Sequence, residues 1–169
     1  MSRSSLSLLH MVTGHVDEAL RLMDGLPSEQ PIFAYSKALA LTAAGRKPEA
    51  VALLEPIEPA AGFDAGLHYA LLVKFALSGR LDRFPEALVP PFVRLAEIDA
   101  CTATVFAMCY ATAGATEAAL DWLEKAVPRG FFNYPYLRNH DRLMTSLHGH
   151  PRFERLMREI QLRWEAFRA

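Results

Sequence analysis

A repeating pattern with a period of about 34 residues is the feature that most limits how this chain can fold. Glycines at positions 14, 45, 79 and 114 are separated by 31, 34 and 35 residues. An apolar stretch rich in alanine and leucine precedes each of them. Three are followed five positions later by an alanine, namely Ala19, Ala50 and Ala119. This spacing predicts four hairpins of two helices each, because glycine adopts at low cost the positive φ that ends a helix.

The alanine of each unit has a predicted packing role. It follows the turn, where the two helix backbones approach closely, so a larger side chain would push the helices apart. The third unit is irregular, because Ala87 aligns with Ala19 only if three residues are inserted after Gly79. A two-helix unit cannot bury its apolar faces alone, so we expect neighbouring units to stack into one core with a concave inner face.

These features resemble the tetratricopeptide repeat family. The small residue of the family's first helix corresponds to Ala38 and Ala107, its aromatic residue to Phe75 and Tyr110, and its terminal proline to Pro31. The family's early tryptophan is absent. The resemblance implies an all-α, right-handed α-solenoid, and another bundle of helical hairpins is the alternative.

We expect one tetratricopeptide-like helical repeat domain over residues 1–169. Its expected parts are hairpins at about 4–26, 32–57, 65–96 and 100–127, a linker at 128–150 and a C-terminal capping helix at 151–168.

The capping helix shows a clear apolar stripe. Six large side chains recur at helical spacing on one face: Phe153, Leu156, Met157, Ile160, Trp164 and Phe167. Arginines interleaved with glutamates cover the rest, and we interpret them as a solvated face. Upstream, the aromatic residues Phe131, Phe132, Tyr134 and Tyr136 are predicted to pack the last hairpin against this helix.

The segment 130–167 resembles the one that closes tetratricopeptide arrays in bacterial signalling proteins with adenylate cyclase, protein kinase or winged-helix regulator domains. That form carries an aspartate before its Pro-Arg-Phe, where this chain has His150. If the imidazole contacts the start of the helix, we expect the cap to be sensitive to pH. We also expect Asp141 to start a short helical turn.

Composition excludes several classes of partner. A formal net charge of -1 does not provide the basic field that a nucleic acid needs, and no apolar run is long enough to predict a membrane span. Cys101 and Cys109 lie eight residues apart in one predicted helix, about 12 Å along its axis, which is too far for a disulfide. We predict that both are buried, reduced thiols of a cytoplasmic protein.

The first helices are expected to line a partner-binding groove. The candidate groove residues are Tyr35, Leu39, Thr42, Tyr69, Val73, Thr104 and Met108. The lysine, arginine and asparagine residues with which some relatives grip a C-terminal carboxylate are missing from this face. Two interpretations stay open: an apolar groove for a peptide or helix of a partner, or a face covered by helix packing or by the protein's own tail.

Neither a metal site nor a catalytic site is predicted. His140, Asp141, His148 and His150 have suitable side chains but poor ligand spacing. Ser146 lies near a histidine and an aspartate in sequence, yet no GxSxG motif frames it. The nine glycines are scattered singly, so no phosphate-binding loop is present.

We therefore expect a non-catalytic protein–protein interaction module without a cofactor. Two alternatives stay open: a regulatory or sensory region of a larger bacterial signalling protein, and a homo-oligomeric scaffold.

Overall fold

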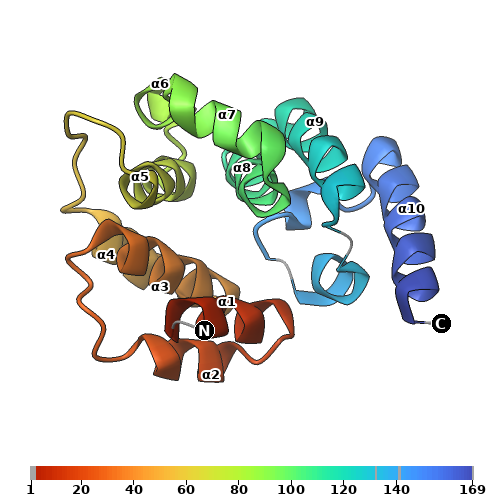
Figure 1. Ribbon diagram of the computed structural model, residues 1–169, viewed down its shortest axis with the longest axis horizontal. Coiled ribbons are helices and arrows are strands. Elements are labelled where there is room, and N and C mark those ends of the chain that lie inside the picture. Colours follow the sequence, from red (N-terminus) through yellow and green to blue (C-terminus); the bar gives the residue numbers. More distant parts are fainter. Residues whose placement is uncertain (1–2, 132, 141, 169) are drawn as a thin grey trace.

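The computed structural model describes residues 3–131, 133–140 and 142–168, apart from the side chains of residues 4, 5 and 140. Within these ranges the chain forms helices, turns and loops, and no β-strand. The predicted all-α class is therefore confirmed. Figure 1 shows helical hairpins following one another from the N-terminal pair to α10.

Four pairs of helices make up the array in the described part of the chain. The first helices are α1 (Arg3–Val12), α3 (Pro31–Ala43), α5 (Ala65–Leu77) and α8 (Ala100–Thr112). The second helices are α2 (Val16–Met23), α4 (Lys47–Leu54) and α9 (Thr116–Ala126), and the third pair has instead a 3-10 turn (Leu81–Arg83), α6 (Phe84–Ala87) and α7 (Pro90–Ile98). The 3-10 turn Val127–Arg129, the π-helical turn Tyr136–His140, the 3-10 turn Thr145–Leu147 and α10 (Pro151–Arg168) follow.

The four turns inside the pairs share one backbone geometry. Gly14, Gly45, Gly79 and Gly114 have φ values of 83°, 79°, 67° and 82°. After each glycine, the next residue donates its backbone N–H to the carbonyl five positions earlier, at 2.8 to 2.9 Å. These bonds satisfy a carbonyl at the end of each first helix. The predicted helix-ending role of the glycines is confirmed.

The alanines after the turns are fully enclosed. Ala19, Ala50, Ala87 and Ala119 each have 0% of their surface exposed. Their packing role is therefore confirmed, and it extends to the irregular third unit through Ala87.

Prolines account for the interrupted second half of the third unit. Val89 has an extended backbone (φ -67°, ψ 152°), as expected for a residue that precedes a proline. Pro90 and Pro91 then occupy the first turn of α7, where no backbone N–H is required. The chain therefore leaves α6 after one turn and starts a new helix.

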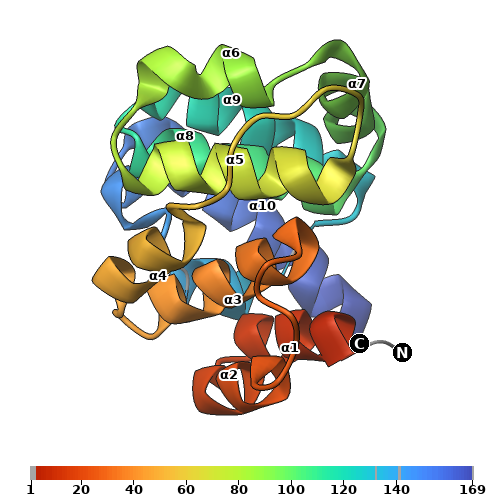
Figure 2. The same ribbon diagram turned by 90° about the vertical axis from the view of Figure 1, so that its left-hand side faces the viewer.

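The array curves until the segment after α9 reaches the first hairpin. Asn133 Nδ2 donates a hydrogen bond of 3.2 Å to the carbonyl of Val12 at the end of α1. Figure 1 shows this segment between α8 and α1, and in Figure 2 helices α1 to α4 lie below α5 to α9 with α10 behind them. The first hairpin and the segment after α9 therefore meet, and together they border the inner face of the array.

An ion-pair cluster holds α10 against α9. The guanidinium of Arg152 contacts Glu117 at 2.8 Å, Asp121 at 2.6 Å and Glu124 at 2.7 Å. The three carboxylates lie at positions i, i+4 and i+7, so they form one acidic stripe on α9. Our prediction of a solvated arginine face was wrong for Arg152, because this stripe faces the start of α10.

The apolar stripe of α10 is buried only along its first half. Phe153 and Ile160 are fully enclosed, Trp164 is half-buried, and Phe167 is exposed. At the start of the helix, His150 Nδ1 accepts the backbone N–H of Arg152 at 3.3 Å. His150 therefore has the geometry of a helix cap, and its expected effect on pH dependence stays a prediction.

Lys74 joins the second and third hairpins from inside the core. Its side chain is buried, and Nζ donates to the carbonyls of Glu55 at 2.8 Å and Ile57 at 2.7 Å, and to the Glu58 carboxylate at 2.9 Å. The ammonium thus satisfies carbonyls at the end of α4. In the sequence this lysine only interrupts an apolar run.

Candidate functional site on the inner face

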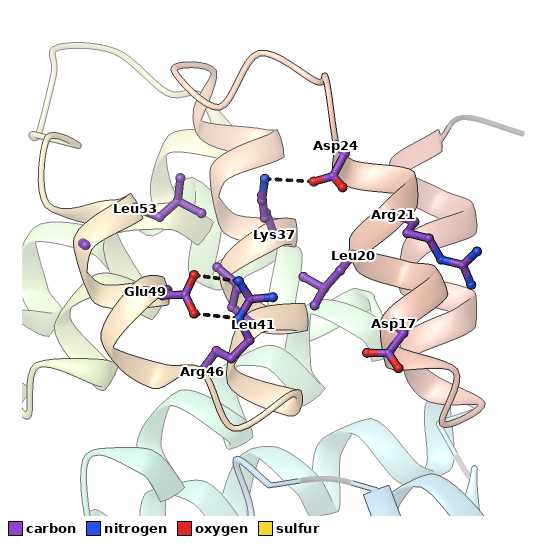
Figure 3. A pocket seen from close by; sticks show the side chains of 10 residues that line it. Asp17, Leu20, Arg21, Asp24, Lys37, Leu41, Arg46, Glu49 and Leu53 are labelled. Atoms are coloured by element: carbon purple, nitrogen blue, oxygen red, sulfur yellow. Dashed lines mark hydrogen bonds and ion pairs between the residues drawn. The ribbon is translucent and has the colours of Figure 1, made fainter.

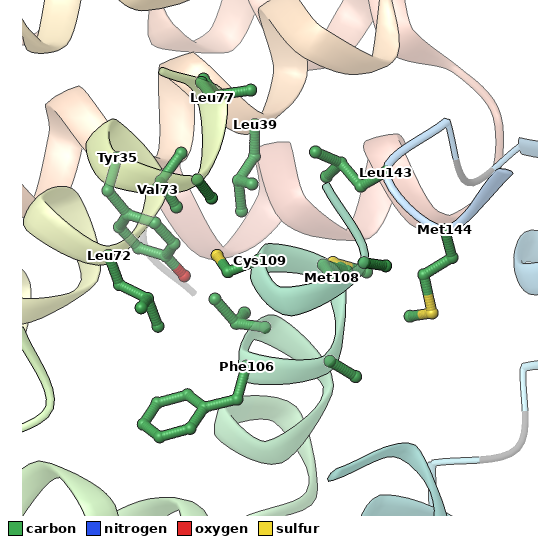
Figure 4. Packing of buried hydrophobic residues seen from close by; sticks show 14 of the residues in the cluster. Tyr35, Leu39, Leu72, Val73, Leu77, Phe106, Met108, Cys109, Leu143 and Met144 are labelled. Atoms are coloured by element: carbon green, nitrogen blue, oxygen red, sulfur yellow. The ribbon is translucent and has the colours of Figure 1, made fainter. Parts of the chain in front are cut away.

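The seven candidate groove residues lie together on the inner face, but most of them are enclosed. Tyr69 is half-buried, and the other six are buried: Tyr35, Leu39, Thr42, Val73, Thr104 and Met108. Figure 4 shows side chains from α3, α5 and α8 packed against one another, with Leu143 of the following segment beside them. Most of this face is therefore covered by helix packing and by the chain's own tail.

One cavity of about 110 Å³ persists within this packing. Four of the candidate residues line it: Tyr35, Leu39, Thr104 and Met108. The rest of its wall comes from α1 (Leu8, Met11 and Val12), from α8 (Cys101 and Val105) and from Phe131. Because Cys101 is exposed and Leu8 and Val12 are half-buried, the cavity reaches the surface beside the start of α8.

One of these residues differs from the sequence expectation, and another has a role that was not expected. Cys101 was predicted to be buried, but it lies in the exposed first turn of α8, whereas Cys109 is buried as predicted. Phe131, which was predicted to pack the last hairpin against the capping helix, also lines the cavity together with residues of α1, α3 and α8. Phe132 and Asp141 lie outside the described residues.

A stacked pair of tyrosines forms one side of the site. The rings of Tyr35 and Tyr69 are 4.7 Å apart and inclined by 16°. The Tyr69 hydroxyl is hydrogen-bonded to Thr102, whose N–H and hydroxyl both donate to Asp99 at 2.6 Å. Asp99 is the N-cap of α8, so the polar chain that fixes Tyr69 begins at a helix start.

The hydroxyl of Tyr35 forms no hydrogen bond with the described residues, and it keeps some solvent access, because the buried side-chain atoms without a partner are those of His68. Burial raises the pKa of Tyr35 well above its usual range, and Tyr69, Cys101, Cys109 and Asp99 add to the effect. Burial likewise raises the pKa of Tyr69 to about 12, against a lowering effect of the bond to Thr102. Both hydroxyls therefore stay protonated at neutral pH and are able to donate.

The thiols of α8 differ in access. Burial raises the pKa of both, and Asp99 adds to the effect at Cys101. Cys109 is enclosed, so only Cys101 is open to a reagent in the folded protein.

The other end of the inner face holds a second cavity, of about 240 Å³, lined by Thr42, Leu77, Ala111 and the segment that contains Leu143. Thr112 Oγ1 donates to the carbonyl of Leu143 at 3.2 Å, and Ser146 Oγ donates to the carbonyl of Ala111 at 3.1 Å. Ser146 therefore anchors the tail to α8.

An outer groove of about 750 Å³ lies between α2, α3 and α4 (Figure 3). Leu20 and Leu41 contribute apolar surface, and two ion pairs lie along it: Lys37 with Asp24 at 3.4 Å and Arg46 with Glu49 at 2.6 Å. Asp17, which also lines the groove, has no ion pair among the described residues. Sequence reasoning missed this groove. Charged residues at helical spacing on α2 and α4 were its only signal, and that pattern is equally typical of any solvated helix face.

The tail histidines have structural contacts. His148 stacks on Phe153 with the ring centroids 5.4 Å apart, and His150 caps α10. Across the described ranges, no group of three histidine, cysteine, aspartate or glutamate side chains could hold a metal ion. The side chain of His140 lies outside these ranges.

Comparison with known families supports the repeat. The family model described as tetratricopeptide repeat matches residues 31–56, which contain α3 and α4. No curated protein and no solved structure matches the chain. None of the helices, as far as they are described, is long and apolar enough to cross a membrane. The match and the repeated hairpins define the class: an all-α protein with tetratricopeptide-like helical repeats.

Proposed function

We propose that this chain is a non-catalytic protein-interaction module that receives an aliphatic or aromatic side chain of a partner segment in the cavity between α1, α3 and α8. The observation that carries the proposal is the convergence of Tyr35, Leu39, Thr104 and Met108 on one apolar cavity that reaches the surface. Aromatic and methionine side chains supply much of the binding energy at protein contacts. Tetratricopeptide repeats generally mediate such contacts.

The inner cavity fits this role better than the outer groove. The cations of the outer groove, Arg21, Lys37 and Arg46, already have carboxylate partners within the chain, so an acidic ligand would have to break one of these ion pairs to use them. The inner cavity presents apolar wall, and filling it costs no ion pair.

Selective alkylation of Cys101 tests the proposal. N-ethylmaleimide should react at Cys101, at the mouth of the cavity, and leave the buried Cys109 untouched. Proteins captured from extracts of the native organism would be quantified by mass spectrometry with untreated protein, treated protein and the treated Cys101→Ser variant. We expect one captured partner to be lost only from the treated wild type.

The serine variant is the matched control, because it keeps the size of the side chain and lacks the thiol. The same partners retained in all three samples would show that recognition does not use the cavity.

Self-association is a second candidate function. Leu162 and Phe167 on α10 are 68% and 73% exposed, and Ile98 on α7 is 77% exposed. Exposed apolar side chains of this size favour contact with a second copy. Light scattering at two protein concentrations tests it, and a constant monomeric mass would remove it.

A regulatory role within a bacterial signalling protein rests on the resemblance of segment 130–167 alone. We further propose a reducing, cytoplasm-like compartment, because the exposed Cys101 is a free thiol.

A further inference from the structure

The unpaired hydroxyl of Tyr35 sets a chemical requirement for whatever enters the inner cavity. Tyr35 is only 6% exposed and lines the cavity, and its hydroxyl has no hydrogen-bond partner among the described residues. The hydroxyl is not one of the fully buried polar atoms that lack a partner, so it keeps some access to water. A group that fills the cavity would displace that water and would have to replace its hydrogen bond. The hydroxyl of the stacked neighbour Tyr69 has a partner in Thr102. Of the two tyrosines, therefore, only Tyr35 has a hydroxyl that is available for a hydrogen bond to a ligand.

The remaining wall of the cavity suits an aromatic ring. Met11 and Met108 supply thioether sulfur, which packs favourably on aromatic rings, and Phe131 supplies a ring. None of the ten lining residues is charged. The volume of about 110 Å³ is close to that of an engineered apolar cavity of about 150 Å³ that binds benzene. One six-membered ring therefore matches both the size and the polarity of the space.

We infer that the cavity recognises the tyrosine side chain of a partner segment, whose ring packs on Met108 and Val105 and whose hydroxyl pairs with the hydroxyl of Tyr35. This inference rests on the proposed function and names the residue that the partner supplies. A phenylalanine or leucine would fill the same volume but would leave the Tyr35 hydroxyl unpaired. A carboxylate or an ammonium group would enter without a charge to compensate its own.

Phenol and benzene are the matched probes, because they differ only in the hydroxyl group. Binding to the full chain would be followed by NMR of the methyl groups of Met11, Leu39 and Met108. We expect phenol to bind about tenfold more tightly than benzene to the wild type, which is the size of one buried hydrogen bond. In Tyr35→Phe the two affinities should become equal, while the ring and its packing are kept.

Tyr110→Phe is the control variant, since it removes a tyrosine hydroxyl of α8 that does not line the cavity. It should keep the preference for phenol. Equal affinities of the wild type for phenol and benzene would overturn the inference, and so would a preference that persists in Tyr35→Phe. In either case the alkylation experiment on Cys101 would still decide the proposed function separately.

A final competition experiment distinguishes two kinds of ligand: a tyrosine side chain of a protein and a free phenolic molecule. N-acetyl-tyrosinamide, which carries the backbone of a peptide-bound tyrosine, should displace phenol, and N-acetyl-phenylalaninamide should do so about tenfold less well. Binding of phenol without displacement by N-acetyl-tyrosinamide would overturn the assignment to a partner's tyrosine.

Discussion

Replacing His68 by phenylalanine should stabilise the protein, although most core substitutions destabilise. His68 on α5 is 3% exposed, and neither ring nitrogen has a hydrogen-bond partner among the described residues. Its ring stacks on Phe63 at 5.5 Å and lies 5.8 Å from Phe92. The surroundings of His68 therefore favour the packing of an aromatic ring, but they offer no hydrogen-bond partner to its two nitrogens.

The expected gain follows from these contacts. An unpaired buried polar group costs about 1–3 kcal/mol. Phenylalanine keeps both ring contacts, and the larger ring can be accommodated because Phe63 is 49% exposed and free to shift outward. We expect the free energy of unfolding to rise by about 1 kcal/mol, which corresponds to an increase of about 2–4 °C in Tm for a chain of this size.

Urea denaturation and thermal melting followed by circular dichroism would measure the change. His148→Phe is the matched control, because His148 also stacks on a phenylalanine but is exposed. Its effect should stay within about 0.5 kcal/mol. A clear loss of stability in His68→Phe would refute the reasoning, since it would mean that the imidazole nitrogens are satisfied in solution.

Three further predictions concern contacts that connect helices of the array. Lys74→Met should lower the free energy of unfolding by about 2 kcal/mol, because it leaves the carbonyls at the end of α4 without a donor; an unchanged urea midpoint would contradict this. Gly45→Ala and Gly114→Ala should each cost about 1 kcal/mol in thermal melts, because both positions need a positive φ. The Arg142 guanidinium that a Cβ at Gly45 would meet at 2.7 Å ends an exposed, flexible side chain and can move aside; a clearly larger loss at Gly45 would contradict this. Arg152 lowers the pKa of Glu124 below its ordinary value of 4.5, so its contribution to stability is present above that pH and is lost as the pH falls through the folded pKa. Urea melts should accordingly show a difference between wild type and Arg152→Met that is largest near neutral pH and shrinks as the pH falls below 4.5 and through the lowered pKa of Glu124. A difference that does not change with pH would count against the Arg152–Glu124 bond.

Much of the local structure follows from the sequence. The turn glycines and the alanines that follow them were found from spacing alone, because a helix ends through hydrogen bonds that reach only five residues back. The prolines at Pro90 and Pro91 mark the break in the third unit for a similar reason: the constraint acts within one or two positions.

The candidate site was predicted only in part. The repeat pattern placed Tyr35, Leu39, Thr104 and Met108 on one inner face, and these four residues do line one cavity. The pattern did not indicate how far that face is closed. Nor did it find the outer groove, or the role of Phe131 as a wall of the cavity.

By itself, the sequence determined the hairpins, their order and the residues of the inner face, since each depends on contacts between neighbours along the chain. Only the tertiary structure decided how sharply the array curves, and therefore that the inner face keeps two small cavities, one walled by α1 and Phe131 and one by the segment that contains Leu143. The partners of Lys74 and Arg152 lie 16 to 35 residues away in the chain, so they too depend on how the hairpins stack. Helix periodicity carries no information about such distant pairs, because the angle between hairpins is the sum of many side-chain contacts across the core.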